Sequence, residues 1–462
     1  MTEQSNWTLL YVGVAFVALV LVCGALVVTV SAGVLFFGEE IMQAVSRSPR
    51  VQPYGELPEP LPQSDMPPNG TLDEQFAAIE TIVVDVRNLP LEEAVPQNLL
   101  TGDELSEIVV EDFLVEYTPE DAADDAVILA AFDVVPITYD LYEFYRRFYS
   151  EGIAGFYDPE EEAFYIISAD DNLDPEEEIT YAHELTHVLQ DQHFDLNDFM
   201  NYGDDRWFID NADAAAARQA VIEGDATLTE RLYEQNYLLP ERREQLYEAY
   251  AEMDLSFFQD IPLFMLNELI FPYQQGYTFV EAVYRTGGFA AVDALYADPP
   301  TSTEQILHPD KYLTDRDEPQ EVTLVEAEAV LPGYREVITS QLGEFGLRNF
   351  LQQEVFLRAS AGADGWDGDR YSVYFNDEAR DVVLIVRIVW DDSAEAEEFR
   401  TVFATYARSW SGTEDPALDT GDLTCWQAGE LLCSASTGDT ETLILRAPEP
   451  VLIEELMGLY AE

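Results

Sequence analysis

The first strong pattern along the chain is a long apolar run near its start. No charged residue occurs between Glu3 and Glu39, and the stretch from Thr8 to Phe37 is almost wholly apolar. This stretch is longer than the roughly 20 residues that a helix needs to span the hydrocarbon core of a bilayer. A cleaved signal peptide would need a basic segment before the apolar run, and that segment is missing. The pattern therefore predicts a retained transmembrane helix within residues 1–40.

A proline-rich segment and then helical patterning follow the apolar run. Residues 41–70 are rich in proline, which predicts an extended, semi-rigid linker. A capping-box opening at Thr71-Leu-Asp-Glu and helical spacing beyond it predict a mostly helical domain over residues 71–318. Within it, Gly152–Tyr157 and Ala163–Ile167 are separated by a turn and predict a short β-hairpin. Helices are expected at 71–87, 102–116, 119–132, 137–149, 175–193, 211–237, 242–268 and 278–295.

The texture changes after Pro319, where strand-like runs become frequent. This predicts a C-terminal α+β domain over residues 319–462, with helices at Tyr334–Ala359 and Ala394–Trp410. Strands are expected at 322–330, 371–375, 382–390, 423–427, 431–434 and 442–446. The expected fold class of the whole chain is α+β: an N-terminal transmembrane helix, a mostly helical domain with one hairpin, and this C-terminal domain.

Charge narrows the classes of function. The 462 residues include 91 Asp and Glu against 22 Lys and Arg, a formal net charge of −69. Such a chain has no basic surface with which to displace counterions from phosphates, which excludes non-specific nucleic-acid binding. A hydrophobic content of 47% is still ample for a packed core, so the acidity does not indicate a disordered chain. Lys311 is the only lysine, which hints at a need for an ammonium group at that position.

The most specific motif is His-Glu-x-x-His, formed by His183, Glu184 and His187. Residues four apart share one face of a helix, so both imidazoles can reach a single metal ion. Glu184 lies at the edge of that face, where it can act as a general base on a water activated by the metal. The chain has only four histidines, so a chance occurrence of this pattern is rare. The motif predicts a zinc site.

Zinc needs a third protein ligand, and three residues are candidates. Glu223 lies in a second helical segment, Ala-Val-Ile-Glu-Gly-Asp-Ala, and is favoured because a Glu from an adjacent helix would complete a His-His-Glu set. His193 follows His187 at the spacing of the metzincin signature, which however needs a Gly at the position of Gln190. Asp191 lies one turn beyond His187, about 6 Å farther along an unbroken helix.

These motifs resemble the gluzincin-type zinc metallopeptidases. The resemblance rests on His183-Glu-Leu-Thr-His-Val-Leu-Gln-Asp-Gln-His, followed by Glu223-Gly-Asp-Ala. It is closest to a largely uncharacterised group of membrane-anchored bacterial and archaeal members. Gly155-Phe-Tyr-Asp-Pro and Ser302-Thr-Glu-Gln-Ile-Leu-His-Pro-Asp-Lys-Tyr also resemble the pattern of that group, so the resemblance covers roughly residues 150–315.

The resemblance implies that the protein hydrolyses peptide bonds in a peptide or protein substrate. His183, His187 and Glu223 would hold Zn²⁺, and Glu184 would be the general base. Two other classes stay open: a catalytically inactive zincin-like scaffold that binds a partner at the cell surface, and a structural protein in which the motif is incidental. An intact Glu184 argues against the scaffold, because a purely structural metal site has no need for Glu at that position.

Two further features follow from the resemblance. Gly152–Tyr157 could be the edge strand that aligns an extended substrate by strand addition. Gluzincins also use a His or a Tyr to stabilise the oxyanion, and His308 or Tyr312 could serve here as catalytic residues. A structural role for His308 before Pro309 stays open, as does an ordinary hairpin in place of the edge strand.

The cysteines and the charges that flank the apolar run point to different cellular compartments for the body of the protein. Arg47 and Arg50 follow the apolar run and no basic residue precedes it, which by the positive-inside rule would place the body in the cytoplasm. Cys425 and Cys433 are symmetric about Gly429, so a tight hairpin would bring them within reach of a disulfide. A structural disulfide implies an oxidising compartment, and two buried free thiols are the alternative. We expect a single-pass protein of the cell membrane with an extracytoplasmic body.

Overall fold

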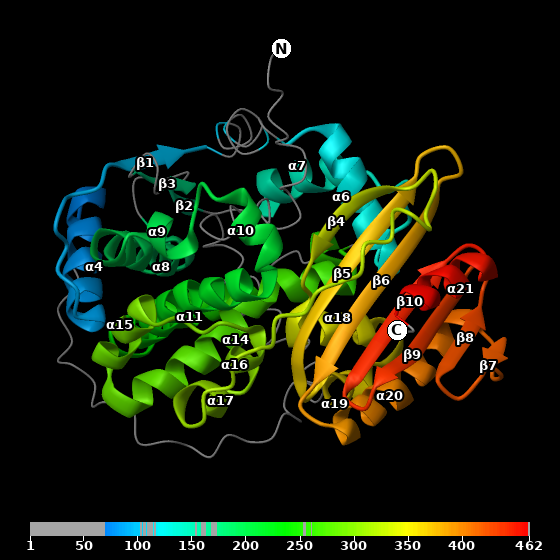
Figure 1. The fold of residues 1–462 in the computed structure, drawn as a ribbon. Helices are drawn as coiled ribbons and strands as arrows, with labels where there is room; N and C mark the ends of the chain where they lie inside the picture. The colour runs from blue at the N-terminus through cyan, green and yellow to red at the C-terminus, as the bar shows by residue number, and fades with distance from the viewer. Residues whose placement is uncertain are drawn as a thin grey trace, which may run out of the picture.

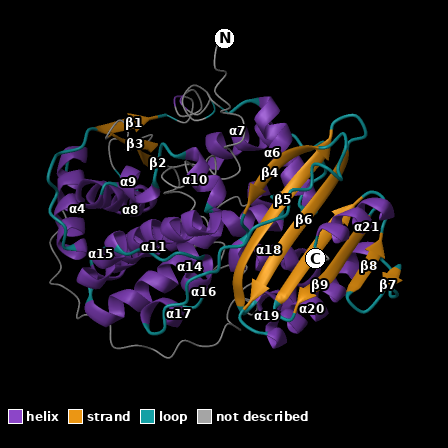
Figure 2. Ribbon diagram, in the orientation of Figure 1, coloured by secondary structure: helices purple, strands orange, loops and turns teal. Residues whose placement is uncertain are grey.

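The computed structural model has two parts, a mostly helical part and a seven-stranded sheet covered by helices (Figure 1). Figure 2 shows that the strands gather in the C-terminal part, apart from a small sheet at the far end of the helical part. The structure describes residues 70–101, 104, 108, 114, 117–152, 155–158, 163–167, 173–252, 256–259 and 261–460.

The helical part agrees in outline with the sequence pattern. Its helices are α4 (Leu72–Arg87), α6 (Pro119–Ala131), α7 (Leu141–Gly152), α8 (Pro175–Phe194), α9 (Leu196–Met200), α10 (Asp205–Asp210), α11 (Ala212–Asn236), α12 (Pro240–Glu252), α13 (Ser256–Gln259), α14 (Leu263–Gly287), α15 (Phe289–Ala297), α16 (Thr303–Leu307) and α17 (Asp310–Leu313). The helix expected at 102–116 falls mostly outside the described residues.

The transmembrane helix in the expected fold class requires a correction. Among the residues that the structure describes, no helix is both long enough and apolar enough to cross a bilayer. Even the 25-residue α14 carries Asn267, Glu268 and Glu281 along its length. The anchor expected within 1–40 and the linker expected at 41–70 lie outside the described residues, apart from Gly70.

A small sheet lies against the start of the helical part. The expected hairpin is present: β2 (Gly155–Asp158) pairs antiparallel with β3 (Ala163–Ile167). A third strand, β1 (Gln97–Leu100), runs parallel to β3 on its other side and was not predicted from the sequence. The sheet order β1-β3-β2 therefore leaves β2 at an edge.

Helix α8 is buried on nearly all sides because it packs between α4 and α11. Its start is fixed by a capping box, in which the Asp174 carboxylate accepts from the backbone N–H of Glu177 and the Glu177 carboxylate accepts from that of Asp174. Pro175 occupies the first helical position, where its missing N–H costs nothing. The 13 residues from 178 to 190 are all buried, so the side chains of the His-Glu-x-x-His motif lie inside the protein.

Two glycines let α11 and α14 cross closely. A Cβ on Gly224 would overlap the backbone carbonyl of Gly276, and a Cβ on Gly276 would overlap the carbonyl of Ala220. The absence of side chains at both positions allows direct backbone contact between the two helices. This close crossing fixes the position of α11 at Gly224, directly beside the candidate ligand Glu223.

The C-terminal part is a fully antiparallel sheet in the order β4-β5-β6-β10-β9-β8-β7. Its elements are β4 (Arg335–Ser340), α18 (Gly343–Val355), a 3₁₀ turn (Phe356–Arg358), α19 (Ala359–Ala363), β5 (Trp366–Asn376), β6 (Asp381–Trp390), α20 (Ser393–Ser411), β7 (Leu418–Asp419), β8 (Leu423–Gln427), β9 (Leu431–Gly438), β10 (Glu441–Ala447) and α21 (Pro450–Leu459).

Two elements of the C-terminal part were predicted wrongly. The single helix expected at Tyr334–Ala359 is β4 followed by α18, because the chain turns at Gly343, whose φ is +69°. The strand expected at 322–330 is irregular, with turns at its end. The run Arg335-Glu-Val-Ile-Thr-Ser is rich in β-branched residues and forms the edge strand β4 instead.

The cysteine pair forms the disulfide that the hairpin predicts. Cys425 on β8 and Cys433 on β9 are direct cross-strand partners and are bonded. The turn between them is centred on Gly429, whose φ of +88° requires a residue without a Cβ. The disulfide therefore closes a short hairpin within one sheet.

The two parts share a core. Val127 and Phe132, in and just after α6, belong to the same buried cluster as Phe350 on α18 and Tyr371 on β5. The Phe132 ring meets that of Tyr371 edge-on, with centroids 5.2 Å apart. In Figure 1, α6 lies against the upper end of the large sheet. The sheet is therefore packed firmly against the helical part.

Candidate metal centre

Helices α8 and α11 bring three predicted ligands together in the interior. Glu223 Oε2 lies 3.2 Å from His183 Nε2 and 3.6 Å from His187 Nε2. The two imidazoles come from consecutive turns of α8, with ring centroids 4.9 Å apart. All three side chains are buried, with at most 1% of each exposed. Two nitrogens and one carboxylate oxygen thus converge from two helices.

These three atoms fit a zinc ion. Zinc binds His nitrogen and carboxylate oxygen at about 2.0–2.1 Å, so the ligand atoms of a tetrahedral site lie about 3.3–3.4 Å apart. The observed separations of 3.2 and 3.6 Å are close to that edge length. The other carboxylate oxygen, Glu223 Oε1, is buried and has no hydrogen-bond partner among the described residues. A buried carboxylate left in this state favours a bound cation.

Glu184 lies beside the candidate ligands and is held by the edge strand β2. One of its carboxylate oxygens and one ring nitrogen of each histidine lie within 4.8 Å of one another. Glu184 Oε2 also accepts a hydrogen bond of 3.2 Å from the backbone N–H of Tyr157 on β2. Glu184 Oε1 is buried without a hydrogen-bond partner in the described part of the chain. This orientation leaves one oxygen available for proton transfer.

Each imidazole is oriented by a separate partner behind it. His183 Nδ1 lies 3.1 Å from Glu230 Oε2, and His187 Nδ1 lies 2.8 Å from Gln190 Oε1. Both partner oxygens accept, so each Nδ1 carries a proton, and each Nε2 is the nitrogen that would bind a metal in place of its own proton. Because Gln190 stands where the metzincin signature needs Gly, the helix continues and its amide contacts the histidine instead.

Gln190 is itself fixed by a buried ion pair. Its amide nitrogen donates to Ile222 O at 3.0 Å and to Asp225 Oδ2 at 3.1 Å. Asp225 binds Arg87 of α4 through a contact of 2.8 Å in which neither side chain is exposed. Tyr296 also donates to Asp225 Oδ2, at 3.0 Å. The second histidine is thus connected through one amide to helices α4, α11 and α15.

The charges of the cluster favour a cation. Burial lowers the pKa of His183, but hydrogen bonds to Glu223 and Glu230 outweigh this and raise the pKa to about 10. Burial raises the pKa of Glu184 to about 7. Burial also acts to raise the pKa of Glu223, yet His187 and His183 hold it below its usual value. The buried carboxylates of Glu184, Glu223 and Glu230 therefore surround the two imidazoles, and a cation bound there would offset their negative charge.

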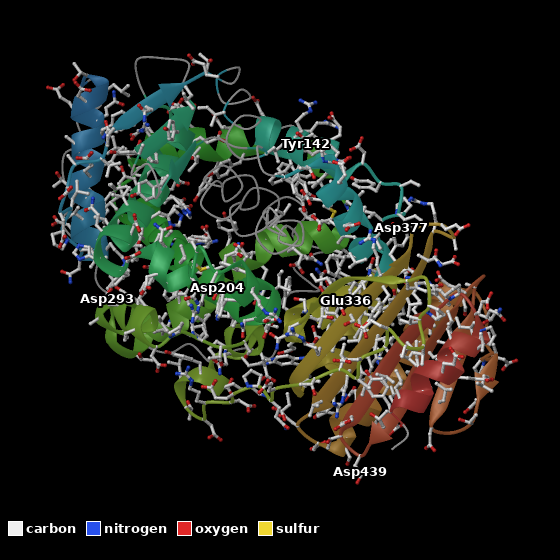
Figure 3. All side chains as sticks on the ribbon, turned by 45° about the horizontal axis from the view of Figure 1, so that its top comes forward. Tyr142, Asp204, Asp293, Glu336, Asp377 and Asp439 are labelled. Carbon is white, nitrogen blue, oxygen red and sulfur yellow. A yellow bond between two sulfur atoms is a disulfide. The ribbon has the colours of Figure 1, made fainter. Side chains whose placement is uncertain are left out.

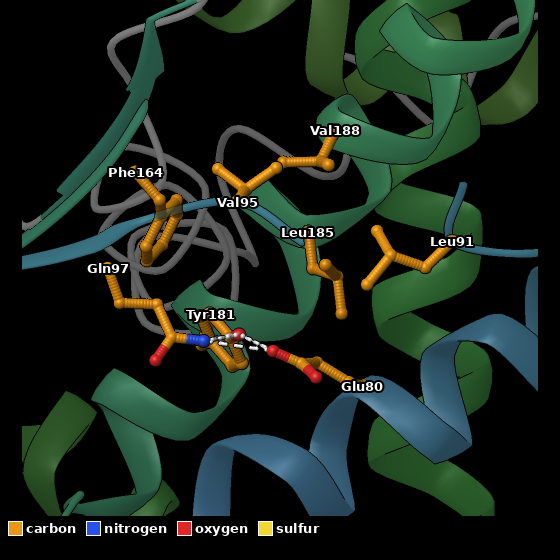
Figure 4. Close-up of a pocket in the computed structure, with 8 residues that line it drawn as sticks. All are labelled: Glu80, Leu91, Val95, Gln97, Phe164, Tyr181, Leu185 and Val188. Carbon is orange, nitrogen blue, oxygen red and sulfur yellow. Dashed lines mark hydrogen bonds between the residues drawn. The ribbon is translucent and has the colours of Figure 1, made fainter. Parts of the chain in front are cut away.

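The back of α8 is locked to its neighbours. Tyr181 Oη donates to Glu80 Oε1 on α4 at 2.8 Å, and the Gln97 amide of β1 donates to both oxygens (Figure 4). Leu185 and Val188 complete this apolar face. The space left between these side chains is only about 10 Å³, too small for a substrate group. This face of α8 therefore serves to hold the helix.

Comparison with known proteins adds one finding. Residues 309–457 match the model of a domain of unknown function (DUF8575). No curated protein and no solved structure matches the chain significantly. The matched region is the C-terminal sheet with its helices, and the candidate metal ligands lie before it.

The other two candidates for the third ligand lie elsewhere. His193 Nε2 donates to the carbonyl oxygen of Pro90 at 2.7 Å, at the exposed end of α8. Asp191 accepts from Tyr157 Oη at 2.9 Å and from the backbone N–H of Leu196 at 3.0 Å. These contacts tie the end of α8 to β2 and to the following turn, which leaves Glu223 as the residue placed against both imidazoles.

The structure does not bring the predicted oxyanion residues to this cluster. His308 Nε2 lies 3.0 Å from Glu344 Oε1 on α18, and Tyr312 Oη donates to Asp298 O at 2.6 Å. In the view of Figure 1, α16 and α17 lie on the opposite side of α11 and α14 from α8. None of the described contacts of these two residues involves a candidate zinc ligand. Their positions correspond to contacts with the C-terminal part and with the loop after α15.

Sequence reasoning missed Glu230, Gln190 and Arg87. Glu230 follows Glu223 by seven residues, two turns of the same helix, and Gln190 follows His187 by three. Both spacings place a side chain on the relevant helix face, so helical periodicity could have found them. Arg87 reaches Asp225 across 138 residues of sequence, and the local pattern holds no signal for that contact.

Proposed function

We propose that this protein is a zinc-dependent metallopeptidase of the gluzincin type, with His183, His187 and Glu223 as the zinc ligands. The observation that carries the proposal is the convergence of two Nε2 atoms and one carboxylate oxygen from α8 and α11 at separations near 3.4 Å. The outer partners of both imidazoles support it, because they leave each Nε2 free to bind a metal.

Glu184 is the proposed general base. When bound, zinc would lower the pKa of water and polarise the carbonyl of the scissile bond. The Glu184 carboxylate, fixed at Oε2 by Tyr157 N–H, would accept the proton of the attacking water at Oε1 and deliver it to the leaving amine. A buried carboxylate held at one oxygen performs both transfers without rotating away.

The edge strand supports a peptide as the substrate. The N–H of Tyr157 on β2 donates to Glu184, and β2 is an outer strand of its sheet. An extended peptide that pairs with that edge would pass directly beside the carboxylate. Strand addition would align the scissile bond through main-chain hydrogen bonds, which favours unfolded or extended segments of protein.

The proposal is tested by incubating the zinc-loaded protein with a mixture of unstructured peptides and identifying the products by mass spectrometry. Glu184→Gln is expected to keep its zinc and to lose about 10²–10⁴-fold in rate, as removal of a general base does. Glu248→Gln, an exposed acid on α12, is the matched control and should cleave normally. Zinc binding without any cleavage by the wild type would favour the inactive scaffold, and cleavage unaffected by Glu184→Gln would exclude this mechanism.

A further inference from the structure

A second cluster of metal-type donors lies where the helical part meets the C-terminal part. His308 Nε2, at the end of α16, lies 3.0 Å from Glu344 Oε1 on α18 and 3.9 Å from Asp364 Oδ1, just after α19. One donor atom from each residue falls within 4.8 Å of the others. A nitrogen and two carboxylate oxygens therefore converge from three separate segments of the chain.

One oxygen of the Glu344 carboxylate has no hydrogen-bond partner among the described residues. The side chain is 3% exposed, and its second oxygen, Oε2, is buried with no hydrogen-bond partner in the described residues. A buried carboxylate oxygen without a partner is unfavourable unless a cation or a water satisfies it. Asp364, in contrast, is 60% exposed. The cluster is thus buried on the Glu344 side and open to solvent on the Asp364 side, so an ion can enter.

The surrounding charge favours a cation. The carboxylates of Glu344, Asp364 and Glu304 act on the His308 imidazole. Two cations oppose them: the guanidinium of Arg348 acts on Glu344, and the ammonium group of Lys311 lies 2.6 Å from Glu304 Oε1. Three carboxylates against two cations leave one net negative charge around a neutral imidazole.

In a neighbouring cluster of carboxylates, a side-chain cation balances the negative charge. The ammonium group of Lys311 lies 2.6 Å from Glu304, 2.8 Å from Asp317 and 3.1 Å from Asp391. The only lysine of the chain thus stands at the centre of three carboxylates. Within the described residues, no ammonium group occupies the equivalent place beside His308 and Glu344.

We propose that His308, Glu344 and Asp364 form a second binding site for a divalent transition-metal ion. One imidazole nitrogen with two carboxylate oxygens suits Zn²⁺ or Mn²⁺, and leaves further positions for water. The ion connects the segment after α16 to α18 and to the loop after α19, so it holds the two parts of the molecule together. The site is independent of the peptidase proposal, because none of its residues belongs to the first cluster.

The experiment counts metal ions per chain. The purified 462-residue protein is dialysed against Zn²⁺, or against Mn²⁺, in the presence of excess Mg²⁺, which displaces loosely held ions from surface carboxylates. Elemental mass spectrometry then gives the equivalents bound. His308→Ala and Asp364→Asn should each bind one equivalent less than the wild type, with at least one of the two metals. Asp364 is exposed, so its substitution should leave the fold intact.

Two controls make the count specific. Asp439→Asn removes an exposed carboxylate in a turn of the large sheet, seen at the rim of the molecule in Figure 3, and should bind as much metal as the wild type. His193→Ala removes a histidine whose partner is the Pro90 carbonyl and should also leave the count unchanged. If His308→Ala and Asp364→Asn both retain the wild-type count with both metals, the second site does not exist. A loss shared by the controls would show diffuse surface binding and would overturn the proposal equally.

Discussion

At the scale of single residues, the two imidazoles of the proposed zinc site have different hydrogen-bond partners. His183 meets a carboxylate directly, whereas His187 meets the Gln190 amide, which connects it to the buried pair of Asp225 and Arg87. Residues that orient a ligating histidine are typically worth about 10–100-fold in metal affinity. We therefore propose that Gln190 is a positioning residue for the candidate metal centre.

Gln190→Ala should accordingly weaken zinc binding by about 10–100-fold without abolishing it. The measurement is a competition titration of zinc against a chromophoric chelator. Gln192→Ala is the matched control, because Gln192 lies on the same helix but bonds the surface segment at Glu93. Equal zinc affinity in the two variants would show that the Gln190 amide plays no part in orienting His187.

Another residue-scale prediction concerns a buried acid outside the candidate metal centre. Burial raises the pKa of Asp125 on α6 to about 8, although Tyr117 Oη donates to it at 2.8 Å. Between about pH 4 and pH 8 the folded protein keeps a proton on Asp125 that the unfolded chain releases, so stability falls as pH rises through this window. The slope from this group is up to about 1.4 kcal/mol per pH unit.

Asp125→Asn removes this proton linkage and preserves an acceptor for Tyr117. The free energy of unfolding, measured by urea denaturation at pH 5 and pH 8, should fall less in the variant than in the wild type, by about 1–4 kcal/mol. Parallel losses of stability in both proteins would mean that Asp125 is ionised in the folded state at pH 5.

Much of the candidate site could be predicted from single residues, and the reason is local spacing. His183, Glu184 and His187 lie within five residues on one helix, and Glu223 was favoured because a Glu from an adjacent helix would complete a His-His-Glu set. The roles suggested for His308 and Tyr312 came from resemblance alone. Their placement depends on how α16 and α17 pack against the C-terminal part, which local sequence does not specify.

At the scale of elements, the crossing of α11 and α14 determines where Glu223 stands. The contact depends on glycines at 224 and 276, since a Cβ at either position would overlap backbone of the other helix. Backbone cannot move aside as the end of a side chain can, so the helices would have to separate.

Gly224→Ala should therefore destabilise the protein by about 1–3 kcal/mol, and should weaken zinc binding because Glu223 moves with its helix. Thermal unfolding and zinc titration report the two effects. Gly458→Ala on α21 is the matched control: a Cβ there meets nothing within 4 Å, so the change should be neutral or stabilising by up to about 1 kcal/mol. A similar melting temperature in both variants would contradict close backbone packing at Gly224.

The elements themselves were predicted best where end signals were strong. The capping boxes at Thr71 and Asp174 and the Pro at the first helical position set helix starts that the pattern could locate. Strand β1 was missed because a four-residue strand has too little periodicity to stand out. The prediction of a single helix at Tyr334–Ala359 was wrong. The helical pattern that follows Gly343 was extended backwards over residues that form β4.

At the scale of the whole molecule, the chain has a net charge of −69. Where the helical part meets the C-terminal part, one lysine partly neutralises three carboxylates. Lys311 sits among Glu304, Asp317 and Asp391, which join α16, the following loop and the end of β6. Its removal would leave three carboxylates facing one another. A compact ammonium group suits this three-way contact better than a planar guanidinium, which explains a lysine at this position in a chain whose other cations are Arg.

Lys311→Gln should lower the free energy of unfolding by about 1–2 kcal/mol in dilute buffer, a figure reduced for the partial exposure of these groups. In about 1 M salt the Debye length falls to about 3 Å, so repulsion among the carboxylates is screened and the difference from the wild type should shrink. Denaturation curves at two salt concentrations measure this. A deficit that does not change with salt would mean that the lysine acts through packing.

The division of the chain into parts could be predicted only in outline. The change of texture near Pro319 marks the start of the C-terminal part, yet Val127 and Phe132 of the helical part complete its core. Contacts between segments about 240 residues apart, such as Phe132 with Tyr371, have no signature in a single sequence. The predicted membrane-spanning helix finds no counterpart in the described part of the chain.

The central claim is the metal centre, and crystallography at the zinc absorption edge tests it most directly. An anomalous difference map of the zinc-loaded protein should show a peak about 2.0–2.2 Å from His183 Nε2, His187 Nε2 and one oxygen of Glu223. That result would establish the ligand set on which the proposed peptidase rests. A map with no peak between α8 and α11, or with the ion held by His193 or Asp191 in place of Glu223, would contradict it.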